Sequence, residues 1–186
     1  MRIDDIIYFS KNFKTAYLDL DNGEELLYAF IDRVEEFYLK PAEELDDEWH
    51  AFAKGVLVLT AIDFIGKYFI GGANSYRIKE FCRGLQSFEG LDSKTVEIAI
   101  STINDSYRNG LIHEGRIKNL GQFSYDFSEL IERSDSYSMI NPRIFLEEVR
   151  YRFHLLAKSI EASTHDLERF RQRIFSDFKP EIDALP

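Results

Sequence analysis

The sequence contains few of the residues that stabilise small secreted domains or interrupt helices. It has one cysteine, four prolines and ten glycines among 186 residues. The single cysteine, Cys82, excludes an internal disulfide, and no basic and apolar signal segment opens the chain at Met1, so we expect a cytoplasmic protein. The scarcity of proline and glycine leaves long stretches of the chain free to form helices.

Long hydrophobic runs and an excess of positive charge are also absent. The longest apolar stretch, from Val56 to Phe69, is interrupted by Asp63 and Lys67 and is shorter than the roughly 20 residues that a bilayer span needs, so we expect no membrane segment. The formal net charge of −10 excludes sequence-blind adhesion to polyanions as the main activity. Any contact with phosphate must therefore be local.

Apolar residues are abundant, and most of them recur at helical spacing. They make up 45% of the chain, which suffices for the core of one domain. Spacings of three and four predict helices over residues 24–39, about 47–70, 75–85 and about 93–114. Pro41 would end the first run, Gly71-Gly72 would end the second, and Asp92/Ser93 would cap the start of the last. Further helices are predicted from Asn141-Pro142 to about residue 163 and over the last segment.

Two parts of the chain give weaker patterns. Ile6, Phe9, Phe13 and Tyr17 favour a short helix within residues 1–22, and alternating apolar residues in 119–140 favour a small hairpin or an ordered loop. We therefore predict an all-α, up-and-down helical bundle forming a single domain over residues 1–186. It would have an N-terminal extension over 1–22, a small hairpin or loop insertion near 119–140 and a C-terminal helical arm over 164–186.

The segment YRNGLIHEGRIK, residues 107 to 118, gathers polar side chains at the end of a predicted helix. At about 100° per residue from Val96, the apolar stripe centres near 10°, Arg108 falls near 120° and His113 near 260°, so both flank the back of the helix. Ile98 and Ile112 lie on that same back face. A second copy of the protein or the C-terminal arm would then cover the face and form a cleft.

The residue types in this segment suit phosphodiester chemistry. Gly115 would end the helix, so His113 would lie in its last turn, where the helix dipole favours a protonated imidazole. The planar guanidinium of Arg108 pairs well with phosphate oxygens. Together the two groups could cleave RNA through its own 2′-hydroxyl, with no metal and no cofactor. On spacing alone, a salt bridge and a satisfied helix end explain the same residues.

The arrangement Arg108-Asn109-x-x-x-His113 resembles the RX4-6H motif of the HEPN superfamily (higher eukaryotes and prokaryotes nucleotide-binding) in its Arg-Asn form. The resemblance covers the motif closely and residues 24–163 loosely, as an order of helices. It implies a helical homodimer that joins two motifs in one cleft and, in active members, a metal-independent endoribonuclease of toxin–antitoxin or defence systems. Arg108 and His113 would be catalytic and Asn109 would orient them. Other members are catalytically inactive dimerisation or binding modules, which is the alternative here.

The resemblance also implies partners. RNA would be the substrate, and an antitoxin or a nucleotidyltransferase would be a regulatory partner. In some toxin members the nucleotidyltransferase modifies a tyrosine that follows the motif histidine, but Gly115 stands at that position here. Asp63 is predicted to support the site by pairing with Arg108, although Lys67 or a backbone group would serve it equally well. His154 and His165 would lie about 16 Å apart on one helix, too far to share a metal.

Overall fold

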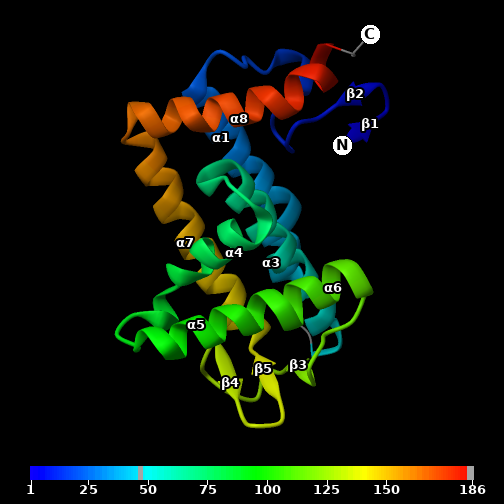
Figure 1. Ribbon diagram of the computed structural model, residues 1–186. Coiled ribbons are helices and arrows are strands. Elements are labelled where there is room, and N and C mark those ends of the chain that lie inside the picture. Colours follow the sequence, from blue (N-terminus) through cyan, green and yellow to red (C-terminus); the bar gives the residue numbers. More distant parts are fainter. Residues whose placement is uncertain (46–47, 184–186) are drawn as a thin grey trace. The chain divides into compact units, whose positions relative to one another are not determined.

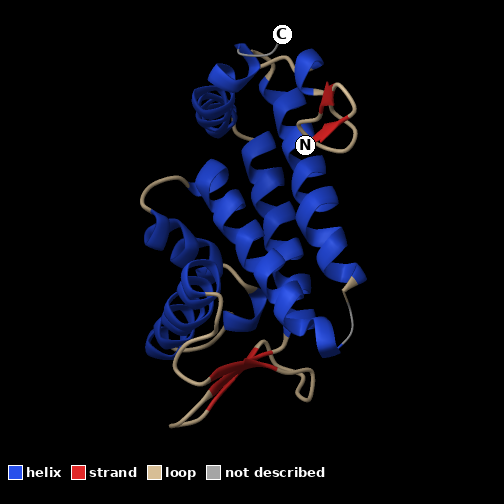
Figure 2. Cartoon of the chain, turned by 90° about the vertical axis from the view of Figure 1, so that its right-hand side faces the viewer, coloured by secondary structure: helices blue, strands red, loops and turns tan. Residues whose placement is uncertain are grey.

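The computed structural model describes residues 1–45 and 48–183 of a mostly helical chain, with few and short strands (Figure 1, Figure 2). The predicted all-α class is confirmed. Contacts within the chain gather into two compact units. Unit 1 consists of Met1–Tyr38 and the chain from His154 onward, and unit 2 consists of Leu39–Phe153. The prediction of one HEPN-like domain with a C-terminal arm stays a prediction, and residues 184–186 of that arm lie outside the described residues.

Unit 1 contains one small hairpin and several helices. Its elements are β1 (Arg2–Ile3), β2 (Ile6–Ile7), the 3-10 turn η1 (Thr15–Tyr17), α1 (Gly23–Val34), most of the π-helical turn η2 (Glu35–Leu39), the last turns of α7 (Pro142–Glu161) and α8 (Thr164–Asp183). The prediction of a short helix within residues 1–22 is wrong. Ile3 and Ile6 pair across an antiparallel turn in which Asp4 has φ 51°, because strand pairing suits these β-branched residues better than a helix does.

Aromatic rings form much of the core of unit 1. Phe30 on α1 meets Phe170 on α8 edge to face, with ring centroids 5.4 Å apart. Phe9 meets Phe178 in the same manner at 5.1 Å. The guanidinium of Arg33 lies 5.1 Å from the ring centroid of Phe9 and donates to the Phe9 carbonyl. These contacts hold α1 and α8 together with the N-terminal segment.

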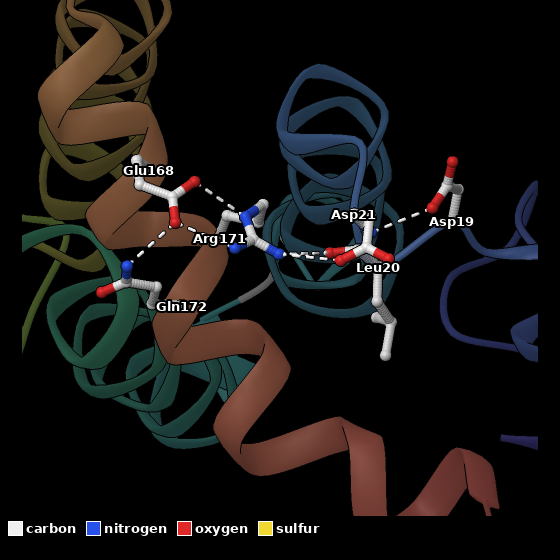
Figure 3. A network of polar contacts seen from close by, with 6 residues as sticks. All are labelled: Asp19, Leu20, Asp21, Glu168, Arg171 and Gln172. Carbon is white, nitrogen blue, oxygen red and sulfur yellow. Dashed lines mark hydrogen bonds and ion pairs between the residues drawn. The ribbon is translucent and has the colours of Figure 1, made fainter.

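A polar network at the surface also joins α8 to the segment before α1 (Figure 3). Arg171 donates through Nε to Glu168 at 2.8 Å, and its Nη1 donates to Asp21 at 3.1 Å and to the Leu20 carbonyl at 3.3 Å. Gln172 donates to the same Glu168 at 2.9 Å. Hydrogen bonds from Arg171 and Gln172 lower the pKa of Glu168 to about 2.

Unit 2 carries the remaining helices and a three-stranded sheet. Its elements are the end of the π-helical turn η2 (Glu35–Leu39), α2 (Lys40–Glu44), the 3-10 turn η3 (Glu48–His50), α3 (Ala51–Ile65), the π-helical turn η4 (Gly66–Ile70), α4 (Asn74–Arg83), the 3-10 turn η5 (Gln86–Phe88), α5 (Ser93–Thr102), the π-helical segment η6 (Ile103–Arg108), α6 (Asn109–Glu114), β3 (Gly121–Phe123), β4 (Ile131–Arg133), β5 (Ser138–Ile140) and the first part of α7.

Several helix ends follow the predicted signals. Gly71 has φ 78° and ends the helical run that contains α3 and η4, and the Asp92 side chain accepts from the backbone of Lys94 and Thr95 at the start of α5. The Asn141 side chain accepts from the backbone of Arg143 at the start of α7. The predicted start near Asp47 lies outside the described residues.

Pro41 does not end the helical run as predicted. The chain stays helical through α2 to Glu44, and the π-helical turn η2 stands directly before the proline. Proline lacks the N–H donor and crowds the carbonyl four residues earlier, which disfavours an α-helical turn there. A π-helical turn uses i→i+5 hydrogen bonds, so it accommodates Pro41 within a continuing helix.

The insertion predicted near 119–140 is the three-stranded sheet, in the order β3-β5-β4. β4 and β5 form an antiparallel hairpin, with Glu132 opposite Met139, and β3 pairs with β5 in parallel. The ring of Phe123 packs on Gly55 of α3, where a Cβ atom would come within 2.1 Å of the ring. Gly55 therefore permits the sheet to approach α3 closely.

α3 is apolar nearly all round and is the central helix of unit 2. Its fully buried residues include Val58, Leu59, Ile62 and Ile65. Among the helices of the described residues, none is by itself long and apolar enough to cross a bilayer, and one bent pair, Glu48–Ile70 with α4, meets that test by length and composition.

Unit 1 should lose stability in acid through Glu168. Its folded pKa lies below the unfolded value of 4.5, so its stabilising effect is complete above pH 4.5 and is lost as the pH falls toward about 2. Denaturant unfolding at several pH values should show Glu168→Gln to be less stable than the wild type at pH 7 and equally stable near pH 2. Glu132→Gln, an exposed change on β4, is the control. A constant difference across this range would contradict the assignment.

Candidate functional site

The motif lies on a continuous helical rod formed by α5, η6 and α6 (Figure 1). The predicted apolar stripe is confirmed, because five of its members are buried: Ala99, Ile100, Ile103, Tyr107 and Leu111. Gly115 has φ 67° and ends the rod, as predicted. This stripe fixes which side of the rod faces the core of unit 2.

Arg108 does not lie on the back of the rod, as constant helical rotation predicted. Arg108 is only 7% exposed. The reason is η6, which has π-helical hydrogen bonding over Ile103–Arg108. Each π-helical residue turns the chain by less than an α-helical one, so Arg108 is carried from the predicted back face toward the core. His113, beyond η6, remains exposed.

The guanidinium of Arg108 is held by groups from two helices. Nε and Nη2 lie 2.8 Å and 2.7 Å from Oδ2 of Asp63 on α3. Nη1 donates to Oδ1 of Asn109 at 2.8 Å and contacts Nε2 of His113 at 3.3 Å. These contacts use four of the five N–H donors of an arginine and leave one on Nη2. The structure therefore brings together all four predicted site residues.

Asp63 is the acidic partner of this arginine, rather than of Lys67 or a backbone group. Its side chain is 18% exposed, and that of Arg108 is 9% exposed. Such a charge needs a partner in this environment, and Arg108 supplies one. Among the described residues, the second oxygen of Asp63, Oδ1, is buried with no hydrogen-bond partner. That oxygen is a remaining acceptor beside the guanidinium.

The contact between Arg108 and His113 has one possible hydrogen-bond direction. A guanidinium only donates, so in this contact Nη1 of Arg108 is the donor and Nε2 of His113 is the acceptor. In the tautomer that accepts here, the Nε2 lone pair can act as a base once the guanidinium turns away. The expectation that the helix end favours a protonated ring stays a prediction.

Tyr107 attaches the rod to the sheet, a role that its place in the apolar stripe did not reveal. Its hydroxyl lies 2.9 Å from the Gln122 carbonyl and 2.8 Å from the Ser138 carbonyl, and it accepts from the Gln122 N–H. Burial raises the pKa of Tyr107 above its usual value, and the hydrogen bonds to Ser138 and Gln122 partly oppose this. The sequence signal for this role was a tyrosine at a core-facing position of the apolar stripe, because a buried hydroxyl needs a hydrogen-bond partner.

The predicted back-face residues remain partly open. Ile98 is 37% exposed and Ile112 is 38% exposed. Ile98 also lines two hollows, one of about 430 Å³ along α5 and η6 and one of about 560 Å³ beside β4. Apolar side chains in this setting are available to a partner surface.

Other reactive groups in the described chain do not form a second centre. No group of three or more histidine, cysteine or acidic side chains among residues 1–45 and 48–183 is placed to hold a metal ion. Cys82 is fully buried, and burial raises the pKa of its thiol to about 12, so it is a poor nucleophile.

Comparison of the chain with protein-family models, with curated proteins and with solved structures gives no match. The geometry of the Asp63–Arg108–His113 cluster and the resemblance of the motif are therefore the two features that bear on function.

The two motif residues should differ sharply in their effect on stability. Arg108→Ala leaves the Asp63 carboxylate without its partner, so we expect the free energy of unfolding to fall by about 3 kcal/mol. His113→Ala removes an exposed ring and should change it by less than about 0.5 kcal/mol. Urea unfolding followed by circular dichroism measures both. Equal effects would contradict the burial and pairing described above.

Proposed function

We propose that the protein is a metal-independent endoribonuclease of the HEPN type, acting in the cytoplasm in a toxin–antitoxin or defence system. The observation that supports this most is the 3.3 Å contact between Nη1 of Arg108 and Nε2 of His113. It joins a permanent cation to an imidazole, which are the two kinds of group that cleavage through the 2′-hydroxyl requires.

In the proposed reaction, a phosphate oxygen of the RNA replaces His113 as the partner of Arg108 Nη1. The freed Nε2 accepts the proton of the 2′-hydroxyl, and the 2′-oxygen attacks phosphorus. A 2′,3′-cyclic phosphate forms as the bond to the 5′-oxygen breaks, and that oxygen takes a proton from an imidazolium. Arg108 stabilises the negative charge that develops on the phosphorane oxygens.

Two supporting residues would keep Arg108 in position for this reaction. Asp63 fixes the Nε side of the guanidinium, and Asn109 accepts from Nη1. Both contacts orient the guanidinium fork. A homodimer through the Ile98 and Ile112 face would add a second motif, whose histidine could supply the proton to the leaving oxygen.

A catalytically inactive module is the second candidate, and one observation favours it. Arg108 is almost completely buried, and most of its donors are engaged by Asp63, Asn109 and His113. A guanidinium held in this manner satisfies a structural role without a substrate. Such a module would bind RNA, an antitoxin or a nucleotidyltransferase without cleaving RNA.

Incubation of the purified protein with RNA in EDTA separates the two candidates. The proposed enzyme yields 2′,3′-cyclic phosphate ends and leaves DNA intact. In His113→Ala the cleavage rate should fall by at least about a hundredfold, as expected for loss of an acid–base group. His165→Ala, which removes another exposed histidine, should retain full activity. Undiminished cleavage by His113→Ala, or none with any RNA, would eliminate the enzyme.

The proposed dimer is tested by its exposed isoleucine. Ile112→Glu would place a charge in the buried centre of a subunit contact, so we expect at least about a tenfold weaker association. Tyr151→Glu, which changes an exposed apolar residue on α7, is the control. Sedimentation equilibrium of the wild type and both variants measures the association. A monomeric wild type, or unchanged association of Ile112→Glu, would contradict a dimer through this face.

A further inference from the structure

We propose that residues 115–120, which we name the basic loop, bind the RNA phosphates next to the cleavage site, and that Glu114, the last residue of α6, limits this binding. The inference rests on the proposed ribonuclease function, since it assigns the element that positions the strand beside His113. The loop begins at Gly115, two residues after His113. It contains Arg116 and Lys118, which are local cations on a chain of net charge −10.

The basic loop has a fixed position against the rod. The backbone N–H of Arg116 donates to the Gly110 carbonyl at 3.2 Å, and that of Lys118 donates to the Ser106 carbonyl at 2.9 Å. The Asn119 side chain donates to the Ser106 hydroxyl at 2.9 Å. The loop therefore folds back beside the helical turn that carries His113.

Gly110 makes this close approach possible. A Cβ atom at that position would lie 2.4 Å from the Arg116 carbonyl oxygen and 3.1 Å from the Lys118 nitrogen. Because residues three apart are neighbours on a helix surface, Gly110 adjoins His113. The glycine in the motif thus brings the backbone of the loop next to the proposed base.

Glu114 occupies both cations of the loop. Its Oε2 lies 2.9 Å from Arg116 Nη2, and its Oε1 lies 2.5 Å from Lys118 Nζ. These pairs lower the pKa of Glu114. The arginine side chain is still 66% exposed, so a phosphate can reach it from solvent. A phosphate that binds the pair must compete with this carboxylate.

A groove continues from the loop along the rod. Asn119 lines it together with the hydroxyl-bearing Ser101, Thr102 and Ser106, and it has a volume of about 430 Å³. Hydroxyl and amide groups are suitable partners for sugar and phosphate oxygens. The groove also contains one cation, Lys94, together with Glu97, which is paired with Arg83, and the exposed Asp105. The loop cations therefore add to the single positive charge that the groove itself offers a polyanion.

Leu120 supports a role for this loop in contact with another molecule. Asn119 and Leu120 both have φ 53°, a conformation that leucine rarely adopts, and the Leu120 side chain is 70% exposed. An exposed apolar side chain held in this manner is available for contact with another molecule.

The test is RNA binding in the His113→Ala background, where cleavage is expected to be at least about a hundredfold slower. Fluorescence anisotropy with a labelled single-stranded RNA of about 12 nucleotides gives the affinity. Glu114→Gln should bind about fivefold more tightly, since it frees two cations at a surface site. Lys118→Gln should bind about fivefold more weakly and reduce the slope of log K against log salt by about 0.7. Glu132→Gln and Lys158→Gln are the matched controls.

The outcomes separate the inference from the function on which it rests. If Glu114→Gln binds no more tightly and Lys118→Gln no more weakly than their controls, the inference is wrong, even if the protein cleaves RNA. If both shifts occur but the protein does not cleave RNA, the loop is the contact of an RNA-binding module and the enzyme proposal fails alone. If Glu114→Gln does not fold, Arg116→Gln, an exposed change that removes a loop cation, takes its place. Weaker RNA binding than in the controls would support the inference, and unchanged binding would contradict it.

Discussion

The ion pair between Asp63 and Arg108 is the contact on which the arrangement of the candidate site depends. It joins α3, the central helix of unit 2, to the rod that carries the motif. A charge with so little exposure is tolerated only with a partner, so the pair fixes the rotation of the rod against α3. Asn109 and His113 then contact Nη1 of the same guanidinium. The proposed chemistry uses this geometry directly.

Among the π-helical segments, one explains how a charged side chain reaches the buried side of the rod. Within the described residues they span Glu35–Leu39, Gly66–Ile70 and Ile103–Arg108. In the last of them, the altered rotation turns Arg108 inward, and the Ser106 carbonyl accepts from the backbone N–H of Lys118 in the basic loop. One local departure from α-helical geometry therefore positions both the buried cation and the loop beside His113.

Features set by neighbours in the chain were predictable, and features set by distant contacts were not. The stripe through Ile100 and Leu111, the cap at Asp92 and the glycine end at Gly115 follow local periodicity and capping chemistry, and all three were predicted. The inward turn of Arg108 depends on π-helical bonding and on Asp63, 45 residues earlier in the chain. The hairpin at Ile3 and Ile6 likewise depends on strand pairing, which helical spacing does not reveal.

The coupling free energy between Asp63 and Arg108 tests this account most directly. A double-mutant cycle of Asp63→Ala, Arg108→Ala and the double variant isolates their interaction in urea unfolding. The account predicts a coupling of about 2 kcal/mol or more, because each single change leaves a nearly buried charge unpaired and the double change removes both. A coupling below about 0.5 kcal/mol would contradict the account, since it would mean that the pair does not hold the rod on α3.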